Sequence, residues 1–119
     1  KELVGKTALF NLQEDFTFAS YLIRVVIDTK KADVEYINYL FNSSILQFQK
    51  DLVSRQITGQ ANINAQEMKE FLFPFPTLEV QQEISSVINK MKNEVSLLID
   101  SSLKLEFQAE QGFEKQIFN

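Results

Sequence analysis

Apolar and polar positions divide the chain into two parts that differ in periodicity. Up to Pro76 the apolar residues come in short runs of different types, whereas after Thr77 they recur at helical spacing until Gly112. We therefore expect an α+β protein, with a small mixed α/β head over residues 1–76. One long C-terminal coiled-coil helix is expected within residues 77–119.

Three apolar runs in the first part predict strands. Residues 7–12 form a short apolar run, and residues 20–27 are rich in β-branched and aromatic side chains without Gly or Pro. The second run is nearly continuous in apolar residues, which is typical of a central strand covered on both faces. Residues 71–73 predict a third, short strand that Pro74 ends.

Helix-capping residues divide the rest of the first part. Asp33 is placed to cap a helix that starts near Val34, and Ser43 or Ser44 to cap the next helix. Asn64 is placed to cap one helical turn over residues 65–70. The sequence therefore predicts three helical segments after the second strand.

The second part carries a heptad seam. Apolar positions alternate in steps of four and three, which is the spacing of a coiled coil. A helix over residues 77–111 would be roughly 50 Å long, more than a small head can cover, so the seam needs a partner helix. That helix comes from the same subunit or from a second copy. The seam consists of Ile84, Ile88, Met91, Val95, Leu98 and Leu105, with Ser102 and Ala109 as small members.

Composition excludes several kinds of chemistry. Among the 119 residues there is no Cys and no His, which rules out disulfides, thiolate nucleophiles and imidazole ligands or bases. No apolar run approaches the ~20 residues of a membrane span, so we expect a cytoplasmic protein without a membrane partner. The chain begins with Lys1 rather than Met, so we expect a processed product or an excised segment.

Charge limits the possible partners. The net charge is -4, from 12 basic and 16 acidic residues. A protein that binds DNA unaided is usually basic, because neutralising phosphates supplies much of the affinity. The excess of acidic residues argues against strong DNA binding by this chain alone. It leaves open that the chain contributes to DNA binding within a larger assembly.

Candidate nucleic-acid contacts fall into two groups. In the polar loop over residues 59–64, the amides of Gln60 and Asn62 are suited to base edges, although both fit an ordinary solvated loop as well. The second group consists of basic residues suited to phosphates, for which scattered solubilising charge is the alternative. These residues are Lys1, Lys6, Lys50 and Arg55.

Four segments carry a family resemblance through their order and spacing. They are Phe-x-Ser-Tyr-Leu-Ile-Arg at 18–24, the pair of helices through 36–43, Gly-Gln-Ala-Asn-Ile-Asn at 59–64, and Pro-Thr-Leu-Glu-Val-Gln-Gln-Glu-Ile at 76–84. Together they resemble the specificity (S) subunit of type I restriction-modification systems. In the last segment Pro76, Leu78, Gln81 and Ile84 match the family's Pro-Pro-Leu-x-Glu-Gln-x-x-Ile junction, while Thr77 and Val80 depart from it.

The resemblance implies a role without catalysis. Such subunits carry target recognition domains, each of which binds one half of a bipartite site in double-stranded DNA. Each domain is followed by a long helix that pairs antiparallel with another and helps to dock methyltransferase (M) subunits. The head would then be the second portion of a recognition domain. No cofactor is expected here, because S-adenosylmethionine belongs to the M subunit and ATP to the restriction (R) subunit.

Two other interpretations remain open. A protein–protein interaction module with a coiled-coil stalk and no DNA role fits the acidic balance and the seam. A small enzyme that uses a carboxylate or a lysine has the least support, because no motif has catalytic spacing. Only the specificity subunit predicts an affinity for DNA that falls steeply with salt once the upstream region of the recognition domain is restored.

The seam yields a first prediction. Replacing both Met91 and Leu98 by Lys should give monomers with lower helicity, because two charges would enter the apolar contact between helices. Light scattering measures the mass and circular dichroism measures the helicity. An unchanged mass in solution would contradict the coiled coil.

Overall fold

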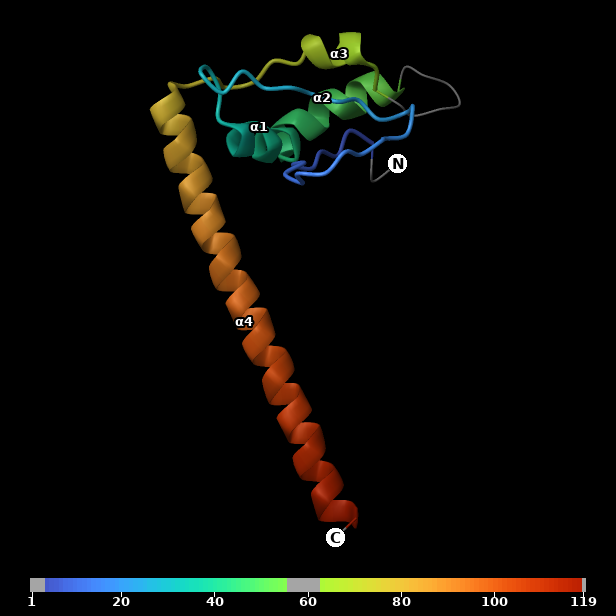
Figure 1. The fold of residues 1–119 in the computed structure, drawn as a ribbon, viewed down its shortest axis with the longest axis vertical. Coiled ribbons are helices and arrows are strands. Elements are labelled where there is room, and N and C mark those ends of the chain that lie inside the picture. The colour runs from blue at the N-terminus through green and yellow to red at the C-terminus, as the bar shows by residue number, and fades with distance from the viewer. Residues whose placement is uncertain (1–3, 56–62, 119) are drawn as a thin grey trace. The chain divides into compact units, whose positions relative to one another are not determined.

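The computed structural model describes residues 4–55 and 63–118, and of Arg55 only the backbone. Four α-helices lie among these residues: α1 (Val34–Phe41), α2 (Ser44–Arg55), α3 (Ala65–Lys69) and α4 (Leu78–Phe118) (Figure 1). The chain divides into two compact units, Lys1–Ser85 and Ser86–Asn119. We call the first unit the head, and the first two turns of α4 belong to it.

The helices begin where the capping residues predict. Asp33 precedes α1, and its carboxylate accepts a hydrogen bond from the Tyr36 backbone N–H at 2.7 Å. Asn64 caps α3, and the Glu67 side chain accepts from the Asn64 backbone N–H, which completes a capping box. The caps at Asp33 and Asn64 are confirmed, because a short polar side chain before an apolar helical run satisfies the first free N–H groups. Helix α2 begins at Ser44, next to the predicted cap, where the Ser43 hydroxyl donates to the Leu40 carbonyl.

The prediction of an α+β head is wrong. The described residues contain helices but no strand or sheet, so the fold is helical with a long C-terminal helix. Residues 7–12 and most of residues 20–27 have no regular secondary structure, and no ladder of backbone hydrogen bonds joins them to a neighbour among the described residues. Tyr21 and Val26 are about three-quarters exposed, not covered on both faces. β-Branched composition favours extended backbone, whereas a strand also needs a partner with which to pair.

The core of the head lies between α1 and α2. Tyr36, Ile37, Leu40 and Phe41 supply one face of α1, and the side chain of Leu46 from α2 is completely buried against them. These α1 positions are spaced by one, three and four residues, which places them on one side of the helix. The apolar face of α1 therefore organises the head.

The connector over residues 71–77 is held to the core by polar side chains. The Gln49 side chain donates to the Leu72 carbonyl at 2.6 Å and accepts from the Leu72 N–H at 2.9 Å. The Tyr36 hydroxyl donates to the Pro74 carbonyl at 2.9 Å, and Phe71 is buried in the core. The third predicted strand is thus also wrong, because a glutamine side chain supplies the backbone partners that a neighbouring strand would have supplied.

A buried polar junction joins the start of α4 to α1. The Asp33 backbone N–H donates to the Gln81 side-chain carbonyl at 2.9 Å, and the Ser85 hydroxyl donates to the Asp33 carboxylate at 2.5 Å. The Gln81 amide donates to the Pro76 carbonyl at 2.8 Å. Gln81 and Ser85 are both buried. We call Asp33, Gln81 and Ser85 the junction, since they attach the first turns of α4 to the rest of the head.

The junction predicts that Gln81 stabilises the head. Gln81→Ala removes the partners of the Asp33 N–H and the Pro76 carbonyl, so the free energy of unfolding should fall by about 1–3 kcal/mol. Gln82→Ala is the matched control, because Gln82 is exposed and its loss should cost less than about 0.5 kcal/mol. Urea unfolding measures both. Equal effects of the two substitutions would contradict the assignment.

Candidate nucleic-acid interface and helix-pairing face

Helix α4 presents an apolar face to solvent. Of the predicted seam residues, Leu98 is 70% exposed, Ile88 is half-buried, and the others lie between 38% and 66%. All residues from 90 to 118 are exposed. An exposed apolar stripe on a helix of 41 residues is consistent with a coiled coil.

The helix extends beyond residues 77–111, over which its length was calculated, because α4 continues through Gly112 to Phe118 within the expected range of 77–119. A glycine costs a helix about 1 kcal/mol relative to alanine and does not force it to end. The continuation adds Phe113 and Ile117, each four residues beyond the previous apolar position, to the stripe.

Several predicted DNA contacts lie outside the described residues. They are Lys1, Gln60, Asn62 and the side chain of Arg55. Lys6 is described and exposed. The prediction of DNA contacts at these five positions stays a prediction.

Lys6 follows Gly5 and precedes a residue that is anchored to α1. The Thr7 backbone N–H donates to the Asn42 side chain at 3.1 Å, and the Asn42 amide returns a hydrogen bond to the Thr7 carbonyl at 2.9 Å. The Thr7 hydroxyl donates to the Asn38 side-chain oxygen at 2.8 Å. The backbone beside Lys6 is thereby held against α1.

Lys50 differs from the other basic candidates because it is buried. Only 1% of the residue is exposed, and its ammonium donates to the Phe41 carbonyl, at the last residue of α1. A cation at that position satisfies a free carbonyl and opposes the negative end of the helix dipole. This burial does not fit a phosphate contact, and we assign Lys50 a structural role.

The surroundings of Lys50 shift its acidity. Burial lowers the pKa of Lys50 below the ordinary 10.5, and repulsion from Lys6 lowers it further. Gly5 covers the aliphatic part of the side chain with a backbone φ of 70°, and a Cβ there would lie 2.7 Å from Lys50 Cδ. Only glycine fits that approach.

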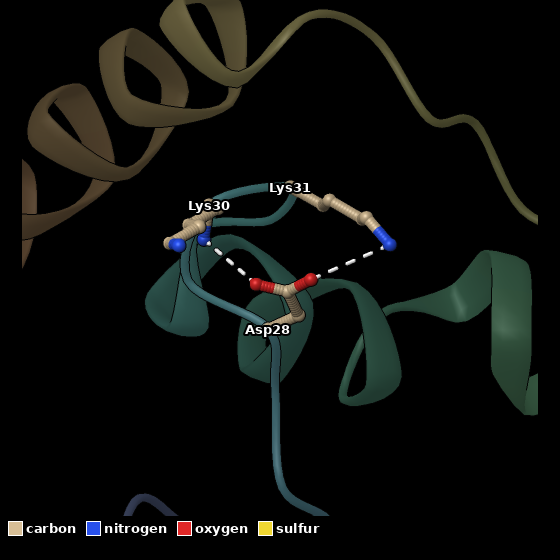
Figure 2. A network of polar contacts seen from close by, with 3 residues as sticks. All are labelled: Asp28, Lys30 and Lys31. Carbon is tan, nitrogen blue, oxygen red and sulfur yellow. Dashed lines mark hydrogen bonds and ion pairs between the residues drawn. The ribbon is translucent and has the colours of Figure 1, made fainter.

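Lys30 and Lys31 are two further basic residues, and the sequence did not single them out as DNA contacts. In the turn before α1, Lys31 pairs with Asp28 at 3.4 Å, and the Lys30 backbone N–H donates to the same carboxylate at 3.1 Å (Figure 2). Lys30 and Lys31 are both exposed. In the sequence, residues 28–31 lie between the predicted strand at 20–27 and the helix that starts near Val34. The signal for a basic surface there was the two adjacent lysines.

Two other kinds of site are absent from the part of the chain that the structure describes. It contains no group of three or more acidic, His or Cys side chains arranged to hold a metal ion. None of its helices combines the length and apolar character needed to cross a membrane.

Comparison with known families identifies the class of protein. The model of the type I restriction modification DNA specificity domain matches residues 2–106, which include the head and most of α4. The chain therefore belongs to this family, whose members determine DNA specificity and are in general not catalytic. Neither the curated proteins nor the solved structures gave a match.

The shifted pKa of Lys50 predicts a dependence of stability on pH. Because the folded protein holds this proton less tightly than the unfolded chain, stability should rise as the pH increases through the lowered pKa towards 10.5. Lys50→Met removes the titrating group, so the difference between wild type and variant isolates it. Urea unfolding between about pH 8 and pH 10.5 measures that difference. Parallel pH profiles of the two proteins would contradict the lowered pKa.

Proposed function

We propose that this chain is a non-catalytic specificity element of a type I restriction-modification complex. The head contributes to binding one half of a bipartite DNA target, and α4 pairs with another helix and positions M subunits. The observation that carries the proposal is the family match, because it spans the head and α4 together. From the same role we infer that the chain acts in the cytoplasm.

The charge of the chain supports a role within an assembly. A net charge of -4 gives little general attraction for phosphates, so affinity for DNA has to come from a few placed contacts and from partner subunits. Lys6 and Lys30 are exposed candidates for such contacts, whereas Lys31, also exposed, pairs with Asp28. Gln60 and Asn62 remain our candidates for base edges.

In such a complex, other subunits catalyse the reactions on DNA. The M subunit binds S-adenosylmethionine and methylates adenine, and the R subunit uses ATP to translocate and cleave DNA. We assign no cofactor and no catalytic residue to this chain. Its contribution is to select where the reaction occurs.

The proposal predicts salt-dependent DNA binding in the presence of the M subunit. The chain co-expressed with the adenine methyltransferase of its own system should bind DNA with an affinity that falls steeply between about 50 and 200 mM salt. Lys6→Ala should reduce the slope of log affinity against log salt by about 1, since one phosphate contact is lost. Lys115→Ala, at the far end of α4, is the control and should leave the slope unchanged.

Fluorescence anisotropy with labelled DNA provides these slopes. A stable complex with the methyltransferase in which this chain adds no DNA affinity would favour the interaction module, the second candidate. Failure of the two proteins to associate would contradict the proposed docking role of α4.

A further inference from the structure

Two residues near the end of α1 fix the backbone that follows Lys6. Asn42 caps this end, and its side chain accepts a hydrogen bond from the Thr7 N–H and donates one to the Thr7 carbonyl. One side-chain amide thereby occupies both backbone groups of Thr7, as a neighbouring strand would. One helical turn earlier, the Asn38 side-chain oxygen accepts from the Thr7 hydroxyl. The chain after Lys6 therefore has a defined place against α1.

The backbone before Lys6 is fixed as well. Gly5 has a backbone φ of 70° and lies so close to two side chains that a Cβ would be 2.7 Å from Lys50 Cδ and 2.9 Å from Ile63 Cδ1. Gly5 and Thr7 are half-buried, whereas Lys6 between them is exposed. The exposed lysine is thus carried by a backbone that is anchored on both sides.

Positive charge accumulates around Lys6. Repulsion between Lys6 and Lys50 contributes to the lowered pKa of Lys50, so the two charges act on the same region. The Lys50 ammonium also opposes the negative end of the α1 dipole, which would otherwise repel an anion there. Among the described residues, no acidic side chain forms an ion pair with Lys6. An anion beside Lys6 would relieve the repulsion, and a DNA phosphate is such an anion.

The anchored backbone matters because binding orders the groups that make contact. A lysine on a flexible segment loses backbone freedom when it contacts a phosphate, whereas the backbone around Lys6 is already ordered. We propose that Asn42 is a positioning residue for DNA binding, which holds the backbone at Thr7 and thereby presents Lys6 to a phosphate of the duplex. The inference rests on the proposed function and names the residue on which its contact at Lys6 depends. Asn42 acts through Lys6 and needs no contact of its own with DNA.

A double-mutant cycle tests whether Asn42 acts through Lys6. The chain in complex with its M subunit is titrated onto a labelled DNA duplex of mixed sequence, because phosphate contacts do not depend on sequence, and fluorescence anisotropy gives the Kd. Asn42→Ala should weaken binding roughly 5- to 30-fold, the cost of ordering one residue's backbone expressed as an affinity. In the Lys6→Ala background the same substitution should change the Kd by less than about twofold, because the contact that it supports is already lost.

Gln49→Ala is the matched control. The Gln49 side chain holds both backbone groups of Leu72, just as Asn42 holds those of Thr7. The control therefore removes an equivalent pair of hydrogen bonds from the head without touching the segment that carries Lys6. Its Kd for DNA should stay within about twofold of the wild-type value.

Gly5→Ala disturbs the anchor on the other side of Lys6. The added Cβ would meet Lys50 and Ile63, so the segment has to shift. Binding should weaken when Lys6 is present and change little in the Lys6→Ala background. Circular dichroism shows which variants keep their helicity, and Gly5→Ala supplies the cycle if Asn42→Ala does not fold.

Three results would overturn the inference. They are equal weakening by Asn42→Ala with and without Lys6, an equal loss in Gln49→Ala, and a wild-type affinity in Lys6→Ala. In each case salt-dependent binding of DNA by the wild-type complex would still support the proposed function. A wild-type complex that does not bind DNA would contradict the proposed function and the inference together.

Discussion

One carboxylate connects the two main elements of this protein. Asp33 caps α1 through the Tyr36 N–H and accepts the Ser85 hydroxyl from α4, while its own backbone N–H donates to Gln81. A buried polar group is tolerated only when it is hydrogen-bonded, so these groups have to find each other in one arrangement. The attachment of the first two turns of α4 within the head therefore depends on the same residue that starts the first helix.

Local signals in the sequence predicted the helices well. Asp33 and Asn64 identified helix starts because capping involves only neighbouring residues, and the seam from Ile84 to Ala109 identified α4 because periodicity is also local. The strand predictions failed for the opposite reason, because strand pairing depends on residues that are distant in the sequence. The core position of Leu46 and the bonds of Gln49 to the connector likewise arise from contacts that spacing does not encode.

The same distinction applies to the candidate site. A lysine on the polar side of a helix is an ordinary choice for a phosphate contact, and the sequence does not reveal that Lys50 reaches the end of α1 beneath Gly5. Gly5 was the available clue, because glycine permits a close approach of backbone to a side chain. For the apolar face of α4, in contrast, the residues and their order were sufficient to predict the face.

The attachment of α4 at one end has a consequence for how that helix forms. Starting a helix costs conformational entropy, because several residues must be ordered before the first hydrogen bond forms. Each later residue then adds its own hydrogen bond. The junction orders residues 81–85 through contacts with the head, so the costly nucleus is already in place there. Residues beyond 85 extend the helix from that nucleus, so we expect fraying to begin at Phe118 and the amide hydrogens of α4 to exchange first at that end.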